Sequence, residues 1–268
     1  MHTSETLGQR MQTRSPDRNI QSYEDAYASD YDFEAVQVRY RREAVLRSVL
    51  ECKPKVVVEI GCGLEPILPH YLTSGGVGIS SWVVVEPSAL FAEGARTLSK
   101  HHPELVVFEN VFEDVAGQLV GRYGHADLVI CSGLLHEVGD QRALLLSIRA
   151  VMDGSSHLHV NVPNAFSLHR RLAKAMGLID HLEQFGDRNI RLQQHRVYSL
   201  QTLLDDLHAA GLRAVSDGGI FMKPFTHLQM TEVVGLLGPE ILPGLARLGQ
   251  EFPELASEIY VNAVVDAV

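Results

Sequence analysis

The stretch VVVEIGCGLEP, residues 56–66, decides the fold of this chain. A continuous run of β-branched residues is typical of a strand that is buried on both faces of a parallel sheet. The run ends at Gly61-Cys62-Gly63, and glycine lets the backbone turn sharply and approach a ligand without a Cβ clash. We therefore expect a ligand site at the carboxyl end of this strand, where open α/β sheets bind their ligands.

Six further apolar runs show a strand pattern, and helical patterns lie between most of them. Alternation of strands and helices indicates βαβ units with right-handed crossovers. We predict an α/β fold with a doubly wound, seven-stranded, mostly parallel, Rossmann-like sheet. The predicted strands are 55–60, 82–85, 105–108, 127–130, 158–162, 212–216 and 259–265. The predicted helices are 33–50, 88–100 with Ser88 as a candidate cap, 141–152, 199–210, and 226–250 with breaks at Gly238-Pro239 and Pro243-Gly244.

The order of these patterns divides the chain into three parts. Residues 1–50 form an N-terminal tail and a helical cap, and residues 51–165 form the ligand-binding core. Residues 166–268 supply substrate-binding elements and the final strands of the same sheet. Within the first part, residues 1–19 read as a disordered lead-in. An aromatic and basic set in the first part is either a lid over the cofactor or an ordinary packed helix: Tyr23, Tyr27, Tyr31, Tyr40 and Arg41.

Composition narrows the class of protein. The chain has 33 acidic side chains against 23 lysines and arginines, a formal net charge of −10, which disfavours nucleic acid as a partner. Cys52, Cys62 and Cys131 include no CxxC pair, which argues against a disulfide framework or a zinc site. No apolar run reaches the ~20 residues of a membrane span, and no apolar signal segment opens the chain. We predict a cytoplasmic protein with a small-molecule substrate and no membrane partner, and leave a homodimer open.

Two kinds of adenosine ligand compete for the glycine loop. A dinucleotide fingerprint needs G-x-G-x-x-G, but Pro66 stands where its third glycine belongs. Glu86 ends the second predicted strand, 23 residues after Gly63, where an acid can accept both hydroxyls of a ribose. Glu86 suits either kind of ligand, and the missing third glycine makes a dinucleotide the less favoured of the two.

Three segments in order carry a family resemblance: Glu59-Ile60-Gly61-Cys62-Gly63, Val83-Val84-Val85-Glu86-Pro87-Ser88 and Ala126-Asp127-Leu128-Val129-Ile130. They resemble the motifs of class I S-adenosylmethionine-dependent methyltransferases, of which E-x-G-x-G is the first. The resemblance implies S-adenosylmethionine as cofactor, with Glu59, Gly61 and Gly63 at its methionine end and Glu86 on its ribose. It implies that the adenine lies near the segment after the third strand. The candidate cofactor-binding residues are Glu59, Gly61, Cys62, Gly63, Glu86, Pro87, Asn110, Val111, Phe112 and Ser132.

Candidate catalytic residues follow the fourth predicted strand, in SGLLHEVGD at 132–140. This segment is similar to the L-E-H-V of the ubiquinone-pathway O-methyltransferases, with the acid and the histidine exchanged into His136 and Glu137. A hydroxyl acceptor needs a base, and a histidine near its ordinary pKa suits that role. We predict His136 as the base, with packing or helix capping as its alternative role. Glu137 and His195, which precedes the helix at 199–210, are the other catalytic candidates.

Candidate substrate-binding residues come from NVPNAFSLHRR, residues 161–171, and from the segment before the next helix. They are Asn164, His169, Arg170 and Tyr198. Arg170 and Arg171 could clamp a carboxylate or phosphate, or could lie on a solvated helix face. We assign the later polar and aromatic cluster of Lys223, Phe225 and His227 to packing. His157 and His159 share one side of a strand, but nothing nearby completes a ligand set, so no metal is predicted.

The leading hypothesis is therefore methyl transfer from S-adenosylmethionine to an oxygen or nitrogen of a small polar metabolite, such as a sugar or a specialised natural product. Three alternatives stay open: a non-catalytic protein that binds the cofactor, a nicotinamide-dependent oxidoreductase, and an enzyme that transfers the aminocarboxypropyl arm of the same cofactor.

Overall fold

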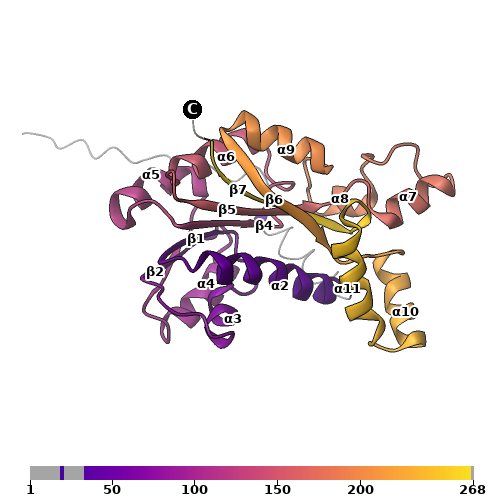
Figure 1. The fold of residues 1–268 in the computed structure, drawn as a ribbon, viewed down its shortest axis with the longest axis horizontal. Helices are drawn as coiled ribbons and strands as arrows, with labels where there is room; N and C mark the ends of the chain where they lie inside the picture. The colour runs from indigo at the N-terminus through magenta and orange to yellow at the C-terminus, as the bar shows by residue number, and fades with distance from the viewer. Residues whose placement is uncertain (1–18, 21–32, 267–268) are drawn as a thin grey trace, which may run out of the picture.

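The chain is built around one seven-stranded sheet (Figure 1). A computed structural model describes residues 19–20 and 33–266. The strand order is β3-β2-β1-β4-β5-β7-β6, with β7 antiparallel to both β5 and β6 and the other pairs parallel. This confirms the predicted fold class. The strands are β1 (Val56–Ile60), β2 (Ser81–Val85), β3 (Leu105–Phe108), β4 (Leu128–Ser132), β5 (His157–Pro163), β6 (Leu212–Ile220) and β7 (Glu258–Val265).

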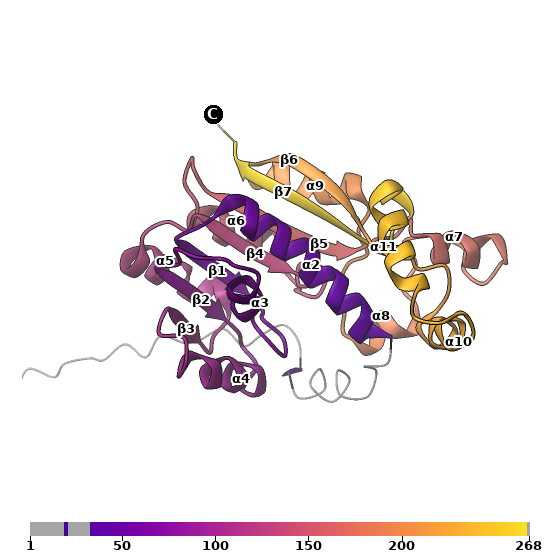
Figure 2. The same cartoon turned by 60° about the horizontal axis from the view of Figure 1, so that its bottom comes forward.

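Two layers of helices cover the sheet (Figures 1 and 2). One face packs against α5 (Phe112–Tyr123), α6 (Gln141–Ala150) and α9 (Leu200–Ala209). The other packs against α2 (Glu34–Cys52), α3 (Leu68–Thr73) and α4 (Ala89–Ser99). The valines of β1 and β2 point alternately into these two cores, which explains why their sequences show no polar alternation.

The remaining helices gather beyond the carboxyl ends of β4 and β5 (Figure 2). They are α7 (Leu168–Ala175), α8 (Asp187–Arg191), α10 (His227–Leu237), α11 (Ile241–Glu251) and a 3₁₀ turn at Pro253–Leu255. The start of α2, the end of β6, α10 and α11 form a third apolar cluster there. These elements are therefore available to shape a site beside the glycine loop.

Several predicted boundaries need correction. The predicted break at Gly238-Pro239 is confirmed, but α11 runs through Pro243-Gly244. Pro243 is the third residue of α11, and the first turn of a helix needs no amide donor, so proline is tolerated there. β6 continues to Ile220 rather than ending at 216, because a bulge between Ala214 and Ser216 keeps it paired with β7. Helix α5 was not predicted, although the acidic residues in its first turn are typical of the start of a helix.

The predicted N-terminal helix is confirmed as α2, which crosses one face of the sheet (Figure 1). Its apolar residues Val45 and Val49 join the core over β1 and β4. Its contact with β5 and β7 is polar, since the Ser48 hydroxyl lies 3.0 Å from His159 Nδ1 and donates to Asn262 Oδ1. The candidate lid tyrosines at 23, 27 and 31 lie outside the described residues. None of the described helices is long and apolar enough to cross a membrane.

Candidate functional site

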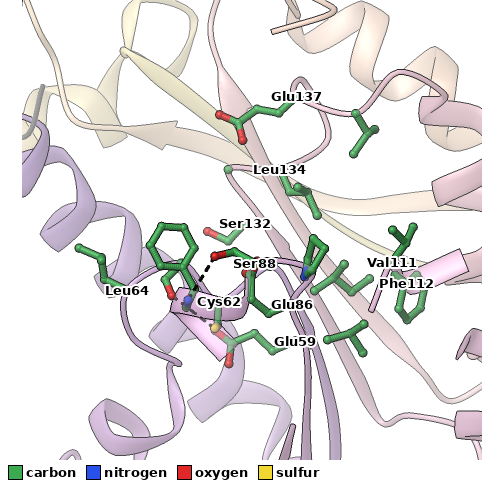
Figure 3. A pocket seen from close by; sticks show the side chains of 18 of the residues that line it. Glu59, Cys62, Leu64, Glu86, Ser88, Val111, Phe112, Ser132, Leu134 and Glu137 are labelled. Atoms are coloured by element: carbon green, nitrogen blue, oxygen red, sulfur yellow. Dashed lines mark hydrogen bonds between the residues drawn. The ribbon is translucent and has the colours of Figure 1, made fainter. Parts of the chain in front are cut away.

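A cavity opens at the carboxyl ends of β1, β2 and β4 (Figure 3). The glycine loop forms its floor, the start of α4 and the start of α5 form two walls, and the segment after β4 forms another. Helix α2 closes it with Val38, Arg41 and Arg42. All of the candidate cofactor-binding residues line this cavity except Asn110, whose Oδ1 accepts the Val111 amide of the same turn.

The glycine loop is held open by its backbone conformation and by one buried acid. Gly61 has φ +72° and Gly63 has φ +57°, in the left-handed region that side chains rarely adopt. Glu59 is 3% exposed and accepts hydrogen bonds from the Ile67 amide at 3.1 Å and from Trp82 Nε1 at 2.7 Å. These bonds tie the two ends of the loop together, and burial raises the pKa of the Glu59 carboxyl to about 7. Glu59 thus shapes the loop from beneath.

Glu86 lies at the end of β2, where its backbone and its side chain are both fixed. Its amide donates to the Phe108 carbonyl at 2.9 Å, and its Oε1 accepts the Ser88 amide at 2.9 Å. The side chain is 5% exposed yet lines the cavity. Ser88 caps α4 by accepting the Phe91 amide, as predicted (Figure 3). A rigid carboxylate at this strand end can accept ribose hydroxyls.

The segment after β4 presents Glu137, rather than His136, to the cavity. Glu137 lies at the opposite end of the labelled side chains from Glu59, beyond Ser132 (Figure 3). His136 is 4% exposed and does not line the cavity, and its Nε2 lies 3.6 Å from Glu137 Oε1. The turn therefore leaves the predicted base behind the acid.

His195 does not line the cavity either. Its side chain is exposed, and only its backbone is tied to this region, through an amide that donates to the His136 carbonyl at 2.9 Å. The backbone of His195 therefore lies beside the segment after β4, while its side chain is exposed. A catalytic role for His195 has no support from its position.

The candidate substrate-binding residues are held by the protein itself. Asn164 is buried and bonds the carbonyls of Glu254 and Ala256 and the amide of Phe166. Tyr198 is fully buried, and its hydroxyl donates to Asp206 Oδ2 at 2.9 Å.

The two candidates on α7 differ from each other. Arg170 donates to the carbonyls of Leu182 and Gln184, which leaves it bracing a loop. His169 Nδ1 is buried and has no hydrogen-bond partner among the described residues. Burial and the nearby charge of Lys223 lower the pKa of His169 to about 2, so its ring is neutral.

The charges in the cavity wall discriminate between ligands. Five acids line it against two arginines: Glu59, Glu65, Glu86, Glu113 and Glu137 face Arg41 and Arg42. Arg42 pairs with Glu65 at 3.2 Å. Such a wall suits a cationic ligand and opposes the two negative charges of a dinucleotide pyrophosphate. Among the described residues, no group of three or more histidines, cysteines or acids could hold a metal ion.

Comparison with known proteins agrees with this geometry. A family model described as a methyltransferase domain matches residues 36–217, more than half of the chain. The chain belongs to the methyltransferase family. A search of curated protein sequences found no significant match.

Solved structures share the fold of this methyltransferase at low identity. An S-adenosylmethionine-dependent methyltransferase from Mesorhizobium loti has a TM-score of 0.57 and 17% identity, with 84% of this chain and 97% of that chain covered. The plantazolicin methyltransferase BamL, solved with a triazolic desmethylPZN analogue and S-adenosylhomocysteine, has a TM-score of 0.54 and 14% identity, covering 92% and 98%. A methyltransferase solved with the Haloferax volcanii Trm112 activator has a TM-score of 0.55 and 14% identity, covering 95% and 100%.

The residues that line the cavity of this methyltransferase fit S-adenosylmethionine as cofactor. The acid excess suits its sulfonium and ammonium charges. The left-handed glycines leave room at the strand end, since a Cβ on Gly61 would already lie 3.4 Å from Leu134. Sequence reasoning overlooked Arg42 and Glu113 as cavity residues, because the helices that carry them show no motif.

Proposed function

We propose that the enzyme methylates an oxygen or nitrogen atom of a small polar metabolite, such as a sugar or a specialised natural product. The observation that carries this proposal is the Glu137 carboxylate, buried in the cavity wall at the end of β4. A hydroxyl or a protonated amine must lose a proton when it accepts a methyl group, and a carboxylate at this place can take it. The BamL complex with a small natural-product analogue supports a small-molecule acceptor.

The cavity assigns a part to each group of residues. Bound S-adenosylmethionine supplies an electrophilic methyl group on a sulfonium. Glu86 binds the ribose, Gly61 and Gly63 leave space for the methionine arm, and Val111 and Phe112 pack on the adenine. Glu137 receives the acceptor proton, and His136 stabilises the Glu137 position from behind. Holding both reactants in line accounts for most of the acceleration in such a transfer.

The test is turnover by a Glu137→Gln variant. The full chain is incubated with S-adenosylmethionine and a pool of sugars, hydroxy acids, amino acids and phenols, and S-adenosylhomocysteine is measured. We expect the variant to lose about 10²- to 10⁴-fold in rate, as for removal of a general base, with unchanged affinity for S-adenosylhomocysteine. Glu51→Gln, at an exposed position on α2, is the control and should keep the full rate.

The products distinguish the remaining possibilities. A ¹³C-labelled methyl group reports by its chemical shift whether oxygen or nitrogen was methylated. Release of methylthioadenosine instead of S-adenosylhomocysteine would mean transfer of the aminocarboxypropyl arm. Full activity of Glu137→Gln would show that Glu137 is not the base.

A further inference from the structure

A second group of buried charges lies beside the cofactor cavity, where the start of α2 meets the segment after β6. We call it the cationic cluster. Its charged members are Arg41, Arg188, Lys223, Glu34 and Glu258. Lys223 lies three residues after the end of β6, is 7% exposed, and donates to Gln37 Oε1 at 3.3 Å.

The hydrogen bonds within the cationic cluster leave some N–H donors of Lys223 without an acceptor among the described residues. Gln37 Oε1 accepts from Lys223 Nζ at 3.3 Å and from His227 Nε2 at 2.5 Å. His227 Nδ1 in turn accepts from Arg188, so this ring is neutral with its proton on Nε2. An ammonium has three N–H donors, and within the described part of the chain Lys223 uses one of them, on Gln37.

The carboxylates of the cationic cluster are engaged by its arginines. Glu34 accepts from Arg41 at 3.0 Å and from Arg188 at 2.7 Å, and Glu258 accepts from Arg41 at 2.6 Å. Among the described residues, Lys223 forms no ion pair with either carboxylate. Burial and the charge of Arg188 lower the pKa of Lys223 to about 7. A buried charge without a counter-ion is costly, and a bound anion would remove that cost.

His169 supplies a second, independent sign of a ligand. Within the part of the chain that the structure describes, its Nδ1 is buried without a hydrogen-bond partner, and the charge of Lys223 acts on its ring. Buried polar atoms in proteins nearly always have a hydrogen-bond partner. His169 Nδ1 and the unused donors of Lys223 Nζ therefore indicate a place where a bound polar ligand would supply the missing partners. The two groups come from α7 and from the end of β6, which are far apart in the sequence.

The cationic cluster lies within reach of the methyl-transfer site. Arg41 belongs to the cluster and also lines the cofactor cavity, where a Cβ on Gly133 after β4 would lie 3.5 Å from its guanidinium. Glu258 pairs with Pro163 at the carboxyl end of β5, the neighbour of β4. An acceptor that contacts Glu137 could therefore extend past Arg41 toward Lys223.

We propose that Lys223 and His169 bind an anionic group, a carboxylate or a phosphate, on the methyl acceptor. This inference rests on the proposed function, because it extends the same site. It divides the site by charge: the acid-lined cavity holds the cationic cofactor, and the cationic cluster holds the anionic end of the acceptor. The acceptor is thereby oriented with its hydroxyl or amine at Glu137.

The experiment measures anion binding without turnover. The full chain is saturated with S-adenosylhomocysteine and titrated by calorimetry with benzoate, succinate and inorganic phosphate, with neutral benzamide as the reference. We expect at least one anion to bind ten-fold or more tightly than benzamide. Lys223→Met should abolish that difference, and Lys174→Met, at an exposed position on α7, should keep it.

Thermal stability gives a second readout, because the melting temperature shows whether the Lys223→Met variant is folded. If Lys223 is a buried cation that lacks an ion pair until an anion binds, ligand-free Lys223→Met should melt at the same temperature as the wild type or higher. If Lys223 serves only to anchor Gln37, the variant should melt lower and anions should bind it as they bind the wild type, which would overturn the inference. Failure of all three anions to outbind benzamide would overturn it too.

These outcomes are separable from a failure of the proposed function. Absence of anion binding with intact cofactor binding counts against the cationic cluster as a site. Absence of turnover with intact anion binding counts against the methyl-transfer proposal for Glu137.

Discussion

Glu59, Glu86 and Glu137 have the same side chain but different surroundings. Glu59 is occupied by the Ile67 amide and the Trp82 ring, so it shapes the loop. Glu86 is aimed by the Ser88 amide and faces the cavity. Glu137 lines the opposite end of the cavity from Glu59, with His136 beside it. The three glutamates therefore differ in the partners that each carboxylate has in the folded protein. The residue type alone does not reveal this difference.

His159 gives a pH-dependent prediction at this scale. It is fully buried beneath α2, and burial lowers its pKa to about 4. Because the folded pKa lies below the unfolded value of about 6.5, protonation favours the unfolded chain. The stabilisation is present above pH 6.5 and is lost as the pH falls toward 4, at up to about 1.4 kcal/mol per pH unit.

We therefore expect the free energy of unfolding of the wild type to fall more steeply between pH 6.5 and 4 than that of His159→Gln. Urea denaturation at several pH values measures this. His157→Gln, at the exposed start of the same strand, is the matched control and should keep the wild-type slope. Equal slopes for His159→Gln and the wild type would contradict the buried, neutral state of His159.

At the scale of elements, two glycines should respond in opposite ways to alanine. Gly61 ends β1 with φ +72° and already lies against Leu134, so alanine there adds strain of about 1–2 kcal/mol. Gly117 lies within α5 with open space around it, so alanine there should stabilise the fold by about 0.5–1 kcal/mol. Denaturation midpoints measure both changes.

The same two alanine variants distinguish an effect on the geometry of the glycine loop from an effect on the stability of the whole fold. Gly61→Ala should also weaken binding of S-adenosylhomocysteine, because the loop faces the cavity. Gly117→Ala should leave that affinity unchanged. A Gly61→Ala variant with wild-type affinity would show that the strand-end turn does not approach the cofactor.

At the scale of the whole molecule, the distribution of charge sets which ligand enters. The formal net charge is −10, and the described residues that line the cavity repeat this acid excess. The cofactor cavity should therefore reject anionic dinucleotides. We expect S-adenosylmethionine and S-adenosylhomocysteine to bind in calorimetry and NADH to show no binding.

In the same experiment Glu86→Gln should weaken both S-adenosyl ligands by about 10- to 100-fold, since it removes a charge-assisted pair of hydrogen bonds worth about 1.5–3 kcal/mol. Binding of NADH by the wild type would contradict the electrostatic argument. The predicted three-part division of the chain and the homodimer stay predictions at this scale.

The sequence by itself determined the sheet, the glycine loop and the acid at the end of β2. These features depend on local rules: β-branched runs form buried strands, glycine ends them, and strand ends in a parallel sheet share one edge. Such rules act within about ten residues, so the seven strands and nine of the ten candidate cofactor residues could be placed without coordinates.

Only the tertiary structure decided which polar side chains face the ligand. His136 and Glu137 are neighbours in the sequence, and the turn after β4 exposes one to the cavity and buries the other. Asn164 looked like a ligand-binding amide but satisfies two carbonyls of one distant segment, those of Glu254 and Ala256, and the amide of Phe166 in its own turn. Lys223 looked like a packing residue until α2, α7 and β6 were brought together around it. The direction of a polar side chain depends on partners far away in the chain, and no local pattern records them.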